Sequence, residues 1–207
     1  MASENGGYTG LLIDWGGVLT TSLFTSFGSF CAAEGLEPET LARRFRKDPA
    51  ARELLIGLET GAIDEDEFEP QLAELLGVPA PSLIDRMFAG SGPEESMLNA
   101  VLAARSNGIK TGLISNSWGT RRYDRAMLAR LFDGVVISGE EGMRKPAPAM
   151  YTLGAERIGV APERCVYVDD LSFNLEPATE LGMATVHHVD AAQTVAALEQ
   201  LVGVPLR

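Results

Sequence analysis

Several features are scarce in this chain of 207 residues, and each scarcity narrows the class of protein. Its two cysteines, Cys31 and Cys165, fall in a helix-like and a strand-like segment, so they make no disulfide framework of the kind found in small secreted domains. No apolar run approaches the ~18 residues that a membrane helix needs. The polar start, Met1–Gly7, lacks the apolar segment of a secretory leader. We therefore expect a reduced, cytoplasmic protein that does not bind membranes.

Positive charge and histidine are also scarce. The chain has 17 Lys and Arg against 29 Asp and Glu, a formal net charge of −12, which argues against nucleic acid as a partner because no basic surplus would neutralise phosphates. The local basic cluster of Arg121, Arg122 and Arg125 is expected to be a solvated helix face. The two histidines, His187 and His188, follow a predicted strand with no cysteine or carboxylate at ligand spacing, and we expect them to face solvent.

Hydrophobic residues make up 45% of the chain, enough for a well-buried core. Beyond Gly92, short apolar runs alternate with segments of helical spacing. This alternation predicts right-handed βαβ units, and hence an α/β fold with a doubly wound, Rossmann-like parallel sheet whose central strand precedes Asp14. The expected strands are Gly10–Ile13, Lys110–Ser115, Gly134–Ile137, Cys165–Val168 and Ala184–His187, and the expected helices are Pro93–Asn107, Arg122–Leu131, Pro148–Ile158, Leu171–Leu181 and Ala191–Val202.

The stretch from Leu23 to Ala89 has a different pattern. It contains no β-branched runs, and apolar residues recur at helical spacing, as in Phe68, Leu72 and Leu75. Glycines and prolines divide it into four or five short helices. We therefore predict a helical cap domain, residues 23–90, inserted into an α/β core domain that comprises residues 1–22 and 91–207.

Polar side chains follow three of the predicted strands: Asp14, the pair Ser115–Asn116 and the pair Asp169–Asp170. Lys145 precedes Pro146 in the loop between the expected strand Gly134–Ile137 and the expected helix Pro148–Ile158. Because the carboxyl ends of parallel strands meet at one edge of a sheet, these groups are expected to share one site. A carboxylate, a hydroxyl, an amine and two more carboxylates suit attack on an anionic group beside a divalent cation.

Each of these residues has a chemical role to offer. Asp14 would act as a nucleophile on phosphorus and form an aspartyl-phosphate. Ser115 would donate a hydrogen bond to a phosphoryl oxygen, and Lys145 would neutralise charge on the nucleophile and the transferring group. Asp169 and Asp170 repel each other unless a cation compensates, and Mg²⁺ is the fitting ion. Turn formation and helix capping are the ordinary alternatives for these residues, and the presence of all of them together favours catalysis.

The order of these segments carries a family resemblance. It runs Asp14–Thr20 with the sequence DWGGVLT, a helical insert, Ser115–Asn116, Arg144–Pro146 with the sequence RKP, and Val168–Asn174 with the sequence VDDLSFN. This order resembles the haloacid dehalogenase-like (HAD) hydrolase superfamily over nearly the whole chain. Within it, the chain looks most like the phosphatases with a small helical cap, the branch that includes the N-terminal domain of soluble epoxide hydrolase.

The resemblance implies a set of metal ligands and substrate contacts. The Mg²⁺ ligands align with Asp14, the carbonyl of Gly16 and Asp170, with Asp169 acting through water. Gly16 and Gly17 would let the backbone approach the phosphoryl group closely. The further substrate contacts are expected at Asn116, at Trp118, for which aromatic packing is an equal alternative, and at Glu59 of the cap loop.

Gly16 departs from the family pattern, because the phosphatases usually carry a second aspartate there as general acid and base. The resemblance implies a Mg²⁺-dependent phosphomonoesterase acting on a small phosphorylated metabolite. A dehalogenase-like enzyme is an alternative, against which the pair Asp169–Asp170 argues, since that branch needs no metal. A phosphonatase-like enzyme is a second alternative, which would need a Schiff-base lysine in the cap, where Lys47 is the only lysine. A third alternative is a binding domain of low catalytic activity, because Gly16 replaces the usual acid. The sequence does not distinguish a monomer from a homodimer.

Overall fold

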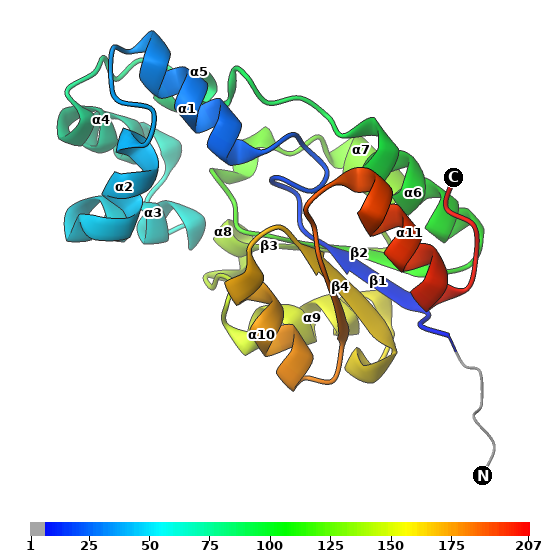
Figure 1. Ribbon diagram of the computed structural model, residues 1–207. Helices are drawn as coiled ribbons and strands as arrows, with labels where there is room; N and C mark the ends of the chain where they lie inside the picture. The colour runs from blue at the N-terminus through cyan, green and yellow to red at the C-terminus, as the bar shows by residue number, and fades with distance from the viewer. Residues whose placement is uncertain (1–6) are drawn as a thin grey trace.

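The computed structural model describes residues 7–207. The expectation that the chain lacks a secretory leader rests on Met1–Gly7, which lies almost wholly outside the described residues. Its centre is a five-stranded sheet in which all neighbouring strands are parallel, in the order β3-β2-β1-β4-β5 (Figure 1). The strands are β1 Gly10–Ile13, β2 Lys110–Ser115, β3 Gly134–Ile137, β4 Cys165–Asp169 and β5 Ala184–His187. The predicted doubly wound sheet, with the strand before Asp14 at its centre, is confirmed.

Helices cover both faces of this sheet (Figure 1). Leu11 and Ile13 of β1 pack into one hydrophobic cluster, and Leu12 packs into the other, as the alternation of side chains along a strand requires. The first cluster includes residues of α6 Glu95–Ser106, α7 Arg125–Leu131 and α11 Ala191–Val202, and the second includes residues of α9 Pro148–Ile158 and α10 Ser172–Glu180. Throughout residues 7–207, every helix falls short of the length and apolar character needed to cross a membrane.

The segment before α7 differs from expectation. The helix begins at Arg125 and not at Arg122, because the Oδ1 atom of Asp124 accepts hydrogen bonds from the first free backbone N–H groups, those of Ala126 (2.9 Å) and Met127 (3.1 Å). A separate 3₁₀ turn, η1, covers Thr120–Arg122. The expectation of one helix face is therefore wrong, because the arginines lie on two elements, although Arg121, Arg122 and Arg125 are all exposed as expected. The two arginines of η1 instead form ion pairs with acidic residues of the inserted helices, namely Glu65, Asp66 and Asp85.

The inserted segment consists of short helices packed around a hydrophobic cluster of their own (Figure 1). The helices are α1 Leu23–Ala33, α2 Thr40–Lys47, α3 Pro49–Glu59, α4 Glu65–Leu76 and α5 Leu83–Phe88, and they meet the expectation of four or five. Asp48 caps α3, and Asp64 with Glu67 forms a capping box at the start of α4. The separate cluster supports a division into residues 23–90 and the remainder, which stays a prediction.

Candidate active site

Three of the expected site residues lie at the carboxyl edge of the sheet. Asp14 follows β1 directly, Ser115 ends β2 and Asp169 ends β4. The parallel register pairs Ile13 with Leu113 on one side and with Val168 on the other, which brings Asp14 level with Asp169 and within one residue of the level of Ser115. All three side chains are buried, so the sheet alone places a hydroxyl and two carboxylates together in a dry setting.

Lys145 connects two of these carboxylates. Its side chain is 1% exposed, and its Nζ atom lies 2.8 Å from Oδ1 of Asp14 and 2.7 Å from Oδ2 of Asp169. Burial by itself would lower the pKa of Lys145, but the charges of Asp14 and Asp169 raise it overall, so the amine stays protonated. Asn116 holds the lysine backbone, because its Oδ1 accepts from the Lys145 N–H (2.8 Å) and its Nδ2 donates to the Lys145 carbonyl (3.2 Å). The expected contact between Asn116 and substrate stays a prediction.

Asp169 has protein donors for both of its oxygens. Oδ1 accepts from the Leu171 N–H (2.9 Å) and from Nδ2 of Asn174 (3.0 Å). Oδ2 accepts from Lys145 and from the hydroxyl of Tyr167. Burial favours the neutral carboxyl, but the charge of Lys145 and these hydrogen bonds hold the pKa of Asp169 below its usual value. An ionised carboxylate with four donors is suited to orient Lys145, and its expected water-mediated contact with a metal stays a prediction.

Asp14 and Asp170 have raised pKa values, in contrast to Asp169. Burial raises the pKa of Asp14 to about 7, against the opposing charge of Lys145 and with the help of the neighbouring carboxylates. Burial and the charge of Asp169 raise the pKa of Asp170 to about 6. One oxygen from each of Asp14, Asp169 and Asp170 lies within 4.8 Å of the others. A hard divalent cation fits these three carboxylates, because its positive charge would offset the repulsion that opposes ionisation of Asp14 and Asp170.

The loop after Asp14 lets the backbone come close to these carboxylates. Gly17 has a φ of +77°, and a Cβ atom there would lie 2.4 Å from Oδ2 of Asp170, so only glycine fits. Gly16 is under no such constraint, since it lies outside the left-handed region and a Cβ atom would meet only the end of the Leu23 side chain, at 2.8 Å. The expected ligation of a metal by the Gly16 carbonyl stays a prediction.

Two tyrosines at the site were not anticipated from the sequence. A hydrogen bond of 2.8 Å joins Oγ of Ser115 to the hydroxyl of Tyr123, whose pKa burial raises well above its usual value. The hydroxyl of Tyr167 contacts Asp169. Tyr167 and Asp169 are two residues apart on one strand and therefore share a face, a signal that the sequence did contain. Tyr123 lies in the irregular segment before α7 and has no comparable signal.

The insertion contributes Glu59, at the end of α3. The residue is 5% exposed, and its Oε2 lies 2.5 Å from Nε of Arg144, the neighbour of Lys145. Burial raises the pKa of Glu59 to about 7, with the charges of Arg144 and Lys145 opposing. Its carbonyl accepts a hydrogen bond from the Ser138 hydroxyl. Glu59 thus joins the insertion to the core beside Lys145, and its expected contact with substrate stays a prediction.

Trp118 projects from the loop after β2 into the insertion. Its ring lies 5.4–6.1 Å, between centroids, from four phenylalanine rings, all in edge-to-face arrangements. These rings belong to Phe27, Phe45, Phe68 and Phe88. The aromatic packing considered for Trp118 is therefore present, and its expected contact with substrate stays a prediction.

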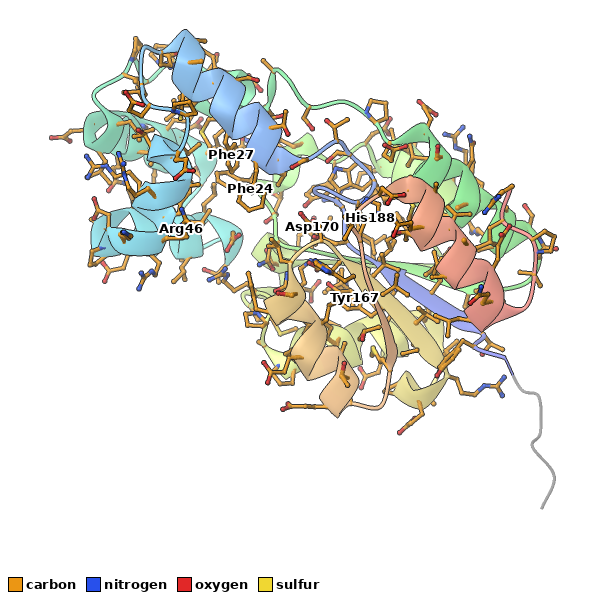
Figure 2. The ribbon with its side chains drawn as sticks, in the orientation of Figure 1. Phe24, Phe27, Arg46, Tyr167, Asp170 and His188 are labelled. Carbon is orange, nitrogen blue, oxygen red and sulfur yellow. The ribbon has the colours of Figure 1, made fainter. Side chains whose placement is uncertain are left out.

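One cavity of about 800 Å³ lies between the insertion and the carboxyl edge of the sheet. In Figure 2, Phe24 and Phe27 lie on the side of the insertion toward Asp170. The structure brings eight of the expected site residues to its wall, namely Asp14, Gly16, Glu59, Ser115, Asn116, Trp118, Lys145 and Asp170. Gly17 and Asp169 lie behind the wall, where they support Asp170 and Lys145.

The two histidines differ from each other. His187 is exposed, and its Nε2 lies 2.9 Å from the carbonyl oxygen of Asp170. His188 is buried, with Nδ1 2.9 Å from Oγ1 of Thr194, and burial lowers its pKa. The expectation that both face solvent is wrong for His188, because helix α11 covers it.

A parallel sheet that gathers an aspartate, a lysine and further carboxylates at one edge defines a hydrolase of the α/β class. Residues 8–182 match the family model of the haloacid dehalogenase-like hydrolases, and the chain belongs to this family.

Named relatives share part of the chain. Bifunctional epoxide hydrolase 2 of Rattus norvegicus is 29% identical over 128 residues, which cover 58% of this chain and 23% of that protein. Glyceraldehyde 3-phosphate phosphatase of Methanopyrus kandleri is 29% identical over 140 residues, covering 62% of this chain and 60% of the relative. The chain thus spans less than two thirds of the length of either relative.

A solved structure supports the fold. A HAD family enzyme of Bacteroides thetaiotaomicron, in complex with magnesium and inorganic phosphate, superposes with a TM-score of 0.66 at 23% identity, over 88% of this chain and 95% of that one. At this identity the likeness concerns the fold.

Proposed function

We propose that this protein is a Mg²⁺-dependent phosphomonoesterase that works through an aspartyl-phosphate on Asp14. One observation carries the proposal: Lys145 lies between Asp14 and Asp169, while Asp14 and Asp170 have oxygens close enough to share one cation. The ligands would be Asp14, Asp170 and the carbonyl of Gly16. Bound Mg²⁺ would neutralise charge on the phosphate ester.

The residues of the chain divide the remaining work. Oδ1 of Asp14 accepts from the Trp15 N–H (2.7 Å) and from Lys145. Within residues 7–207 no donor occupies the other oxygen, which is free to attack. The Asp14 oxygen forms a bond to phosphorus as the bond to the ester oxygen breaks, and the ester oxygen takes a proton from solvent and leaves as the alcohol. Water then cleaves the aspartyl-phosphate, which releases inorganic phosphate and restores Asp14. Lys145 and Ser115 stabilise charge on the phosphoryl oxygens during both steps.

The relatives support the substrate class at a coarse level. One relative is a glyceraldehyde 3-phosphate phosphatase, and a structural neighbour was crystallised with magnesium and phosphate. A phosphorylated metabolite free in the cytoplasm is accordingly the proposed substrate. Lys47 does not line the cavity, which removes the lysine that a phosphonatase-like reaction would need.

The test is phosphate release from a panel of phosphate esters, with Mg²⁺ and with EDTA. Parallel assays follow halide release from 2-haloacids and aldehyde release from phosphonoacetaldehyde. We expect Mg²⁺-dependent phosphate release that Asp14→Asn abolishes. Halide release that persists in EDTA would establish the dehalogenase alternative instead. Binding of phosphate esters without turnover would establish the binding domain that the missing acid at Gly16 leaves open.

A further inference from the structure

The wall of the cavity changes character away from Asp14. Five of the eight phenylalanines of the chain and both tryptophans line it. The phenylalanines are Phe24, Phe27, Phe45, Phe88 and Phe173. Phenylalanine rings offer apolar contact area and no partners for hydroxyl groups, so this part of the wall is poorly matched to a sugar or polyol.

Several charged residues of the cavity wall are poorly placed to bind the hydroxyl groups of a sugar or polyol. Glu59 is paired with Arg144. Arg122 is paired with Asp85 at 2.6 Å and with Glu65 at 3.4 Å. Arg46 is exposed and belongs to α2, on the far side of Phe24 from Asp170 in the view of Figure 2. At Glu59 and Arg122 a polar ligand would have to break existing ion pairs to gain hydrogen bonds, whereas an apolar one would not.

Two of the phenylalanines are exposed to an unusual degree. Phe24 is 57% exposed and Phe173 is 55% exposed, and both line the cavity. Phe24 lies in the first turn of α1 in the insertion, whereas Phe173 lies in the first turn of α10 in the core. Exposed aromatic rings that gather on one concave surface from two separate parts of a chain mark a binding site for apolar groups.

The wall is apolar next to the reacting atoms as well. A side chain at position 16 would point at Leu23, whose Cδ1 would lie 2.8 Å from its Cβ atom. Leu23 therefore stands beside the nucleophile loop, and it also lines the cavity. Leu23 thus extends the apolar part of the wall from Phe24, its neighbour in α1, to the loop that follows Asp14.

We infer that the cavity binds a phosphate monoester of a bulky apolar alcohol, with the phosphate at Asp14 and Lys145 and the apolar group against the phenylalanines. The inference rests on the proposed function for the phosphate end. The volume of about 800 Å³ suits a ligand of drug-like size, whereas a three-carbon phosphate would leave most of the apolar wall in contact with water.

The first test is kcat/KM across n-alkyl phosphates from butyl to decyl, below their micelle concentrations and with Mg²⁺. Leaving-group acidity is constant in this series, so the trend isolates contact with the wall. We expect a rise of up to about fourfold for each methylene until the cavity is full, the value that burial of one CH₂ gives. Glycerol phosphate and hexose phosphates are expected at least about tenfold below octyl phosphate. A flat series, or faster turnover of the polar esters, overturns the inference and leaves the phosphatase proposal standing.

A binding measurement separates the two proposals. Calorimetry compares n-octylphosphonate with methylphosphonate, neither of which is hydrolysed, in the presence of Mg²⁺. Tighter binding of the octyl compound is expected whether or not esters are turned over. Tighter binding without any turnover would defeat the phosphatase proposal and leave the apolar site standing. Equal affinities overturn the apolar site.

Matched variants locate the effect. Phe24→Ser and Phe173→Ser are each expected to lower kcat/KM for octyl phosphate about tenfold and to leave butyl phosphate nearly unchanged. Ile56→Ser and Val189→Ser are the controls, because both residues are also exposed and lie outside the cavity wall. All four sites are exposed, so thermal unfolding is expected to change little. An equal loss in the controls, or no loss in the phenylalanine variants, counts against the inference.

Discussion

The two ends of the cavity are built in opposite ways. At the sheet end, Lys145 is 1% exposed and lies between two carboxylates, each within 2.8 Å. At the insertion end, Phe24 is 57% exposed and makes no polar contact. Buried charges are tolerated only when they are paired and hydrogen-bonded, so the sheet end has one workable arrangement. The exposed phenylalanines are under no such constraint, which leaves selectivity free to change while the chemistry is retained.

The largest effect on this contrast is expected from removing Asp14, the proposed nucleophile. Asp14→Asn keeps the size of the side chain and removes its charge, so kcat is expected to fall by at least about 10⁴-fold. Steady-state phosphate release measures the loss, and mass spectrometry of quenched wild-type enzyme detects the phosphorylated Asp14. Asp66→Asn is the matched control, since Asp66 is an aspartate with 80% of its side chain exposed. Substantial turnover by Asp14→Asn would show that the sheet end does not carry the chemistry.

Metal removal acts on the same end and has a defined pH dependence. Asp14 and Asp170 have pKa values raised to about 7 and about 6 from the ordinary 3.8. In metal-free protein, the stability that these carboxyls contribute is present below about pH 4 and is lost as pH rises through 6 to 7, because the folded state holds their protons longer than the unfolded state. Mg²⁺ compensates the ionised pair, so it is expected to raise Tm more at pH 8 than at pH 5.

Thermal unfolding with Mg²⁺ and with EDTA at the two pH values measures this difference. EDTA is also expected to abolish activity and added Mg²⁺ to restore it. Asp170→Asn is expected to lose most of the Mg²⁺-dependent shift. An equal shift at both pH values would mean that the cation binds elsewhere.

The same contrast explains what was predictable from the sequence. The strand Gly10–Ile13 begins and ends as expected, because a strand buried on both faces is a short continuous apolar run. The position of Asp14 beside Asp169 follows from strand order alone. Contacts between distant loops, such as Glu59 with Arg144, depend on side-chain conformations that no local pattern records. Helical spacing in the insertion identified an apolar face, but spacing does not distinguish a face that packs inward from one that lines a cavity.

A smaller effect is expected from restoring an acid beside the nucleophile. Gly16→Asp places a carboxyl where the family's phosphatases usually have one, and Gly16 accepts a Cβ atom if the flexible end of Leu23 shifts. General acid–base catalysis is worth ~10²–10⁴-fold, and a part of this, about 10-fold to 100-fold in kcat, is expected for alkyl esters. Aryl esters, whose phenolate leaves with little protonation, are expected to gain less.

Two variants serve as controls for this gain. Gly16→Ala adds the Cβ atom without the acid and is expected to bring no increase. Gly17→Ala is expected to impair the enzyme, since its Cβ atom would lie 2.4 Å from Asp170 Oδ2. Stopped-flow release of the alcohol or phenol, the product of the first step, also shows whether wild type has a burst, as expected if hydrolysis of the aspartyl-phosphate lacks its base. No burst, with equal rates on alkyl and aryl esters, would contradict the view that an acid is missing.

The smallest effect on activity is expected from changing Glu59, which lies where the insertion meets the core. Glu59→Gln keeps the shape of a buried residue and removes its ion pair with Arg144, so kcat/KM is expected to fall by less than about tenfold. The measurement is a pH profile on alkyl and aryl esters. A loss of 10²-fold or more that is confined to alkyl esters would identify Glu59, with its pKa near 7, as the proton donor in place of residue 16.

The ion pairs of the 3₁₀ turn η1 have a consequence for how the enzyme responds to its surroundings. Arg121 and Arg122 reach across to Glu65, Asp66 and Asp85, and most of these side chains are at least partly in solvent. Dissolved ions screen such contacts over roughly 8 Å at physiological ionic strength, while the buried contacts of Lys145 are shielded from them. Ionic strength should therefore change how quickly substrate enters and product leaves, with little influence on the reaction itself.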